Sequence, residues 1–189
     1  ETVIANGNKQ VIEILKGTSG LQAGTSAPGG LVNLIVKRPR DQVGTATLTW
    51  QQGGSTGLAL DLGRRENGLG WRVNADIEHL DPLTRNSEGQ RRMLALALEA
   101  QLGNGSLLEA EIEYSRQSQP SVPGFSLLGD RLPSADQIDP RINLNNQAWS
   151  QPVVFEGQTA SLRWTHQLGE HWTFTAHGAT QHLQTDDRI

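Results

Sequence analysis

The residues that could perform catalysis in this chain are few, and their spacing fits none of the common reaction centres. The five histidines are His79, His166, His171, His177 and His182. No His-Glu-x-x-His motif is present, and His177 and His182 are five positions apart, which places them on opposite faces of an extended strand. No Gly-x-Ser-x-Gly motif exposes a serine nucleophile. The sequence therefore predicts no enzyme, no catalytic residue and no metal site.

The most distinctive motif is a glycine-rich loop between two short apolar segments. The loop, Gly17–Gly30, holds five glycines and one proline, a composition typical of tight turns. It lacks the Lys-Ser/Thr ending of a phosphate-binding loop. The flanking runs, Val11–Lys16 and Leu31–Lys37, are almost continuously apolar, which predicts short strands buried on both faces.

The composition excludes several other classes of protein. A net charge of −4, spread along the chain, gives no electrostatic surface for nucleic acid. The absence of cysteine excludes a disulfide framework and a thiolate metal site. No apolar run approaches the roughly 20 residues of a membrane-spanning helix. All three lysines, Lys9, Lys16 and Lys37, lie before residue 40, which we attribute to codon bias rather than to function.

Beyond residue 40 the period of hydrophobicity changes to two. The clearest alternations run through Trp71–Glu78, Leu94–Leu102 and Leu108–Tyr114. The weaker ones are Ala46–Trp50, Leu58–Leu62, Ala160–Trp164 and Trp172–Ala176. Because successive side chains of a strand point to opposite faces, these seven segments predict seven strands of roughly ten residues.

The predicted connections alternate in length. The short ones, after the second, fourth and sixth strands, are Arg64–Gly70, Gly103–Gly105 and Gly169–Glu170. The longer ones are Asp81–Gly89 and a segment at about 117–155, which holds five prolines. Short turns at one end and long loops at the other are typical of an outer-membrane β-barrel. The short join Gly53–Ser55, after the first strand, does not follow this rule.

Several motifs carry a resemblance to a known family. Those of the first segment are Ile12-Glu13-Ile14-Leu15-Lys16-Gly17, Gly24, Pro28-Gly29-Gly30-Leu31-Val32-Asn33 and Lys37-Arg38-Pro39. Those of the remainder are Leu60-Asp61-Leu62-Gly63, Gly68-Leu69-Gly70-Trp71-Arg72-Val73 and Asn146–Pro152. At this spacing the chain resembles the TonB-dependent outer-membrane receptors, which import siderophores and similar scarce nutrients. Their fold is a plug domain inserted in a barrel of roughly twenty-two strands.

The resemblance implies a division of the chain. Residues 1–40 correspond to the C-terminal part of the plug domain, and residues 41–189 to the first strands of the transmembrane β-barrel, with a long extracellular loop at about 117–155. We therefore expect an all-β fold: an antiparallel barrel segment of about seven strands, preceded by the end of a plug. We also expect a fragment that lacks the TonB box, the early plug and most strands. Its open sheet would have two unpaired edges prone to aggregation.

The two faces of the predicted sheet differ in polarity. Aromatic residues near both strand ends, Trp71 and Trp172 at one and Trp50 and Tyr114 at the other, favour contact of the apolar face with lipid. The opposite face carries a row of glutamates: Glu109, Glu111 and Glu113. A water-filled or plug-filled lumen tolerates this row if Arg72, Arg163 or water compensates its charge. The alternative is the solvated face of a soluble sheet.

The resemblance implies active import of ferric siderophores across the outer membrane of a Gram-negative bacterium. The expected partners are a ferric siderophore, outer-membrane lipid and the TonB–ExbB–ExbD complex, which would act through a segment absent here; no nucleic acid is expected. No cofactor is expected either, because iron is carried only as the chelated substrate.

The resemblance also suggests candidate ligand contacts. They are Leu21, Gln22 and Ala23 in the plug, with Phe125, Arg131, Arg141 and Trp149 in the long loop. An arginine suits an anionic chelate. Ala23 stands where siderophore receptors often have an aromatic residue, which leaves the substrate open. The same architecture could import vitamin B12 or an oligosaccharide. Two further alternatives are a passive porin, which needs no residues 1–39, and a soluble β-sandwich binding module with Leu94, Leu96 and Leu98 buried inside.

Overall fold

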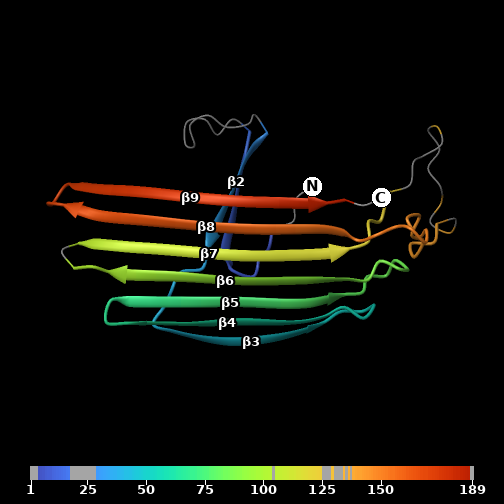
Figure 1. Ribbon diagram of the computed structural model, residues 1–189, viewed down its shortest axis with the longest axis horizontal. Helices are drawn as coiled ribbons and strands as arrows, with labels where there is room; N and C mark the ends of the chain where they lie inside the picture. The colour runs from blue at the N-terminus through green and yellow to red at the C-terminus, as the bar shows by residue number, and fades with distance from the viewer. Residues whose placement is uncertain are drawn as a thin grey trace.

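The structure of the chain is a computed structural model, whose described residues form nine β-strands in two antiparallel sheets (Figure 1). It describes residues 4–17, 29–103, 105–124, 129, 134, 136 and 138–187. Among these residues there is no helix of the length and apolar character needed to cross a membrane. The predicted change in organisation near residue 40 coincides with the passage from the first sheet to the second, because β2 ends at Val36 and β3 begins at Gln42. The assignment of the two parts to plug and barrel stays a prediction.

The first sheet is a hairpin of β1 (Lys9–Lys16) and β2 (Gly30–Val36), paired with Ile12 opposite Leu34. Both predicted apolar strands are therefore present. The expectation that they are buried on both faces is wrong for this chain, because Ile14 and Val32 are 63% and 58% exposed. In Figure 1 the hairpin runs across the direction of the other strands, and only its open end meets them. The rest of its apolar surface has no covering element among the described residues.

The second sheet contains the remaining seven strands in sequence order, each antiparallel to the next. They are β3 (Gln42–Trp50), β4 (Thr56–Glu66), β5 (Leu69–Leu80), β6 (Gly89–Gln101), β7 (Ser106–Gln119), β8 (Val153–Leu168) and β9 (Trp172–Asp186). The predicted number of strands is confirmed. Their lengths, 9 to 16 residues, exceed the predicted ten in most cases. In the described residues β3 and β9 are each paired on one side only, so the sheet is open, as expected.

The connections separate into a short-turn end and a long-loop end, at opposite ends of the strands in Figure 1. The turn between β4 and β5 is only Asn67-Gly68, with φ of 51° and 79°, the two positive values that a type I′ hairpin requires. The prediction of Arg64–Gly70 as the join is therefore wrong, because the strands continue to Glu66 and resume at Leu69. The long-loop end carries residues 51–55, residues 81–88 and the described residues between β7 and β8.

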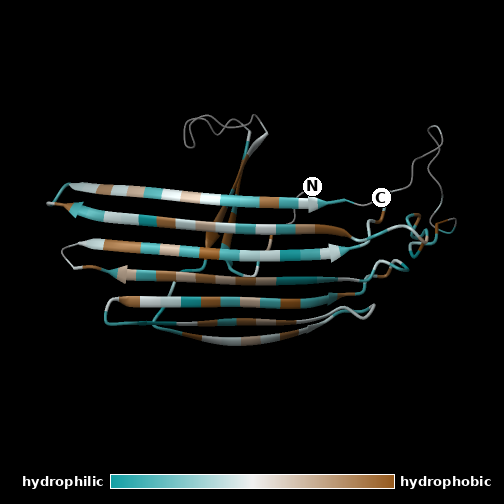
Figure 2. Cartoon of the chain, in the orientation of Figure 1, coloured by the Kyte–Doolittle hydropathy of each residue, from teal (hydrophilic) through white to brown (hydrophobic). Residues whose placement is uncertain are grey.

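The pairing register of the strands places the apolar side chains on one face of the second sheet. Val73, Leu96, Ile112 and Ala160 lie directly opposite one another on β5 to β8, and directly opposite residues share a face. Figure 2 shows the resulting alternation of hydrophobic and hydrophilic residues along the strands. No second sheet covers this face among the described residues, and Ile112 is 57% exposed. The described part of the chain thus shows no packed interior of the kind found in a β-sandwich.

The other face of the sheet is covered in part by the residues that flank the hairpin. Ala5 packs with Met93 and Ala95 of β6 in a small buried cluster. Pro39, which follows the hairpin, is fully buried, and a Cβ placed on Gly70 would lie 2.7 Å from the Cβ of Pro39. Close contact between the backbone of β5 and the Pro39 ring therefore fixes how the first segment joins the sheet.

Substitution of Gly70 by alanine should loosen this junction. The added methyl group would meet a proline ring that cannot rotate away, so we expect a loss of about 1–3 kcal/mol in the free energy of unfolding. Guanidinium-induced unfolding measures it. Gly44→Ala in β3 is the matched control, because its Cβ would have no atom within 4 Å. Equal midpoints for the two variants would refute the close contact.

Candidate functional site

The candidate site is the contact between the N-terminal segment, residues 4–17 and 29–40, and the polar face of the second sheet. The polar face is the one on which Asp61, Asn74, Ala95, Glu113 and Thr159 lie opposite one another across β4 to β8. The alternation that exposes the apolar side chains on one face places these residues on the other. Lys9, Lys37 and Arg38 of the N-terminal segment reach it.

Asp61 is the centre of the first group of interactions. Arg72 donates two hydrogen bonds to its carboxylate, from Nε to Oδ1 and from Nη2 to Oδ2, both at 2.8 Å. Lys37 Nζ approaches Oδ2 to 3.0 Å and also donates to the carbonyl of Gly7 at 2.7 Å. The Arg72 guanidinium uses its remaining group, Nη1, to bind the carbonyl of Arg38 at 2.9 Å. Because Arg72 is only 7% exposed, this bidentate pair between β4 and β5 is out of contact with most solvent. Lys37 and the Arg38 carbonyl tie the N-terminal segment to it.

The glutamate row on β7 is the second group. Arg38 Nε lies 3.5 Å from Glu109 Oε1, and Arg38 Nη2 lies 3.5 Å from Glu111 Oε2. Glu113 forms an ion pair with Lys9 and accepts a hydrogen bond of 2.6 Å from Asn8 Nδ2. Cations of the N-terminal segment therefore face all three carboxylates.

The cations that compensate the charge of the glutamate row differ in part from those predicted. Arg163 does approach Glu109, at 3.6 Å between Nη1 and Oε2, as expected. Arg72 does not reach the row, because its guanidinium is held by Asp61. Sequence reasoning missed Lys9 and Arg38, although the concentration of lysines before residue 40 was an available signal. Its attribution to codon bias was wrong for Lys9 and Lys37, both of which pair with carboxylates of the sheet.

Between these ion pairs the contact is polar and incompletely satisfied. A hollow of about 150 Å³ lies between Gly7 and Lys37 on one side and Asp61, Asn74 and Asp76 on the other. Asn74 is 4% exposed, and its Nδ2 has no hydrogen-bond partner among the described residues. An interface made of a few strong ion pairs with polar gaps can separate without exposing a large apolar surface to water.

Most of the predicted ligand contacts cannot be placed on this site. Leu21, Gln22, Ala23, Phe125 and Arg131 lie outside the described residues. Arg141 and Trp149 both belong to the long connection between β7 and β8, at the long-loop end of the sheet. Trp149 is 73% exposed, and the carbonyl of Arg141 accepts a hydrogen bond of 2.9 Å from the amide of Arg85. The role of all seven residues in ligand binding stays a prediction.

The long connection and the β5–β6 loop are tied together at this end. Besides the Arg85–Arg141 backbone bond, Asn86 Nδ2 donates to Asn146 Oδ1 at 2.9 Å, and Asn143 Nδ2 donates to the Asn86 carbonyl at 3.3 Å. Ser87 is fully buried at the base of the loop, where its carbonyl accepts a bond of 2.9 Å from Gln119 of β7. The two loops therefore present a joint surface at the end of the sheet.

Comparison with known proteins identifies relatives among receptors. No protein-family model matches the sequence. The metal-pseudopaline receptor CntO of Pseudomonas aeruginosa strain UCBPP-PA14 is 29% identical over 93% of this chain and 25% of its own length. The corresponding receptor of strain PAO1 is 28% identical over the same shares. The chain thus spans about a quarter of the length of the curated relatives it matches.

Solved structures agree with the sequence relatives. The ferric-catecholate import receptor Fiu of E. coli K12, in its closed form, matches with a TM-score of 0.81 at 22% identity, over 96% of this chain and 27% of that one. The ferric preacinetobactin receptor BauA of Acinetobacter baumannii matches with a TM-score of 0.81 at 20% identity, over 96% and 28%. The chain has the fold of these receptors at partial coverage. The predicted all-β fold class and the resemblance to TonB-dependent receptors are confirmed. The relatives are receptors rather than enzymes, in agreement with the prediction.

Replacement of Asp61 by asparagine tests the first group of ion pairs. It would leave the buried Arg72 and the nearby Lys37 without their anion, and we expect a loss of about 3 kcal/mol in the free energy of unfolding. The matched control is Glu66→Gln, which removes an exposed partner of Arg64, with side chains 57% and 63% exposed. That change should cost less than about 0.5 kcal/mol. Chemical unfolding compares the two, and losses of equal size would contradict the assignment of Asp61.

Proposed function

We propose that the receptor containing this chain imports metal chelates, ferric siderophores foremost, across the outer membrane of a Gram-negative bacterium. The observation that carries the proposal is the different covering of the two faces of the sheet. The polar face is occupied by cations of the N-terminal segment, whereas the apolar face has no protein partner among the described residues. A wall with lipid on one side and a plug on the other requires this arrangement. The fold shared with Fiu and BauA supports it.

The contacts of the N-terminal segment with the polar face also argue against a passive porin. A porin would need no residues 1–39, yet Asn8, Lys9 and Lys37 contact the polar face directly. A segment that fills the lumen must yield during transport. The ion pairs of the candidate site suit that task, because they can be replaced by water when the segment moves. In this proposal the TonB–ExbB–ExbD complex supplies the force, through a part of the receptor outside this chain.

In this proposal the chelate binds at the long-loop end of the sheet. The joined loops near Arg85 and Arg141, together with the exposed Trp149, provide guanidinium and aromatic groups suited to an anionic chelate with a planar metal-binding ring. Ferric siderophores fit this chemistry. A second candidate is a metal–pseudopaline complex, favoured by the receptors that match at 28–29% identity.

Uptake by a strain that lacks its own receptors and expresses the complete receptor would test the proposal. We expect radioactive iron to accumulate when it is supplied with one or a few siderophores from a panel, and a protonophore to abolish the accumulation, because the transport is energised. Metal–pseudopaline, vitamin B12 and an oligosaccharide, each carrying its own radioactive label, complete the panel.

The outcomes are distinct. Accumulation that survives the protonophore would indicate passive entry and overturn the proposal. Uptake of vitamin B12 or the oligosaccharide alone would retain the architecture but refute chelate import. Uptake of metal–pseudopaline without any ferric siderophore would replace the first candidate with the second.

A further inference from the structure

The apolar face of the second sheet ends in a charged row toward the long-loop end. On β6 and β7 the outward residues pair as Leu96 with Ile112, Leu94 with Tyr114, and then Arg92 with Arg116. On β5 the residue opposite Arg92 is still apolar, Ile77. The border between apolar and charged residues therefore crosses the strands obliquely, as expected when strands are tilted to a membrane.

Arg92 and Arg116 form an unusual pair within this row. Like charges directly opposite one another destabilise a sheet, and their Cβ atoms are roughly 5 Å apart in such a position. Among the described residues, no carboxylate lies within 4.0 Å of Arg92, whose guanidinium lies 6.0 Å from the centre of the Tyr114 ring. Within the described part of the chain Arg116 has one ion pair, at 3.8 Å between Nε and Glu156 Oε2. The described residues thus compensate the positive charge of this arginine pair only weakly.

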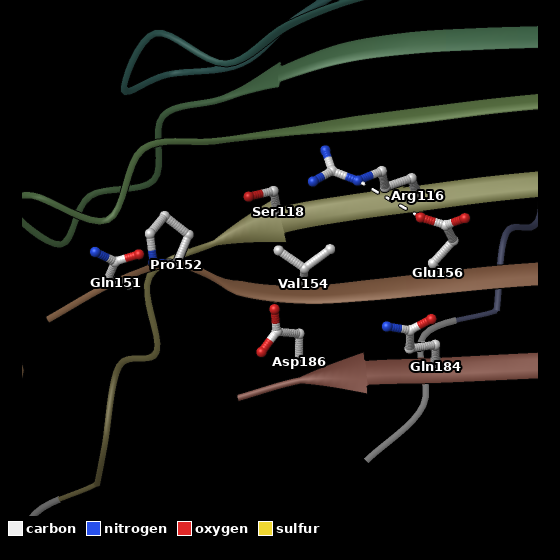
Figure 3. Close-up of a pocket in the computed structure, with 8 residues that line it drawn as sticks. All are labelled: Arg116, Ser118, Gln151, Pro152, Val154, Glu156, Gln184 and Asp186. Carbon is white, nitrogen blue, oxygen red and sulfur yellow. Dashed lines mark ion pairs between the residues drawn. The ribbon is translucent and has the colours of Figure 1, made fainter. Parts of the chain in front are cut away.

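Two hollows of opposite character adjoin the arginine pair on the outward face. Toward the centre of the strands lies an open apolar groove of about 760 Å³, lined by Leu94, Leu96, Ile112 and Tyr114 among others. Toward the long-loop end lies a polar hollow of about 310 Å³, which Arg116 itself lines (Figure 3). In Figure 3 two carboxylates line this polar hollow with Arg116: Glu156, its ion-pair partner on the neighbouring strand, and Asp186 on β9.

We propose that this surface binds an anionic phospholipid, with its phosphate between Arg92 and Arg116 and its acyl chains along the apolar groove. Guanidinium groups bind phosphate oxygens through paired, charge-assisted hydrogen bonds, and an anion between the two arginines would relieve their repulsion. Tyr114 lies at the border between the two parts, where aromatic rings favour the junction of head groups and acyl chains. A free phosphate would engage the arginines only. Because the apolar groove could hold acyl chains, we propose a lipid rather than a free phosphate as the ligand.

This inference rests on the proposed contact of the apolar face with a membrane, and it adds a defined site to that contact. Native mass spectrometry of the complete receptor, after incubation with phosphatidylglycerol, phosphatidylcholine or inorganic phosphate, tests it. The wild type should retain phosphatidylglycerol in preference to phosphatidylcholine. The double variant Arg92→Gln/Arg116→Gln should lower its retention about tenfold, by removing both charge-assisted contacts.

Two single variants sharpen the result. Arg64→Gln changes an arginine at the opposite end of the sheet, 63% exposed in its side chain, and should leave retention unchanged. Glu156→Gln removes the one carboxylate paired with Arg116 and should raise retention. Retention of phosphatidylcholine by the double variant reports that its apolar face is intact.

The contrary outcomes separate the site from the membrane contact. Equal retention of the two lipids by the wild type, or unchanged preference in the double variant, would overturn the site while leaving the membrane contact in place. Retention of inorganic phosphate without lipid would also overturn it. Retention of neither lipid would refute both the site and the proposed contact of the apolar face with a membrane.

Discussion

The structure depends on one constraint: a single layer of sheet must present incompatible surfaces on its two sides. The period-two alternation that gives β7 its apolar side chains gives it three successive carboxylates on the reverse. Three like charges on one strand repel one another and require cations or water. The N-terminal segment supplies Lys9 and Arg38, and β8 supplies Arg163. The chemistry of the polar face thus determines what can lie against it.

The pairing of these cations with the carboxylates of the polar face explains why the N-terminal segment is attached by a few strong contacts rather than by a hydrophobic core. Among the described residues, the buried apolar cluster between the N-terminal segment and the second sheet holds only Ala5, Met93 and Ala95. Asp61, Arg72 and Lys37, by contrast, form a compact ion-pair group. The steric contact between Pro39 and Gly70 fixes the position of the N-terminal segment but contributes little buried area. Such an attachment is specific in geometry, and its separation would expose little apolar surface to water.

Much of this could be predicted from the sequence because the decisive signals are local. Alternation marks all seven strands of the second sheet, and the aromatic residues at strand ends indicate an interface at each end. The errors have physical causes. The predicted join Arg64–Gly70 was too long, because Asn67-Gly68 alone is the preferred type I′ sequence and the strands continue up to it. The pairing of Lys9 with Glu113 joins residues 104 positions apart, and no local pattern encodes it. The exposure of the hairpin depends on what covers it, which its own apolar sequence cannot specify.

The central claim is that the apolar face meets acyl chains while the polar face meets the N-terminal segment. Single spin labels placed at Glu111 and at Ile112, adjacent residues on opposite faces of β7, would test it in the complete receptor reconstituted in a bilayer. This chain has no cysteine of its own to interfere. We predict that the label at Ile112 is relaxed by oxygen, which concentrates in lipid, and is shielded from a water-soluble nickel complex, while the label at Glu111 is restricted in motion and shielded from oxygen. Strong relaxation of the Ile112 label by the nickel complex would contradict the account.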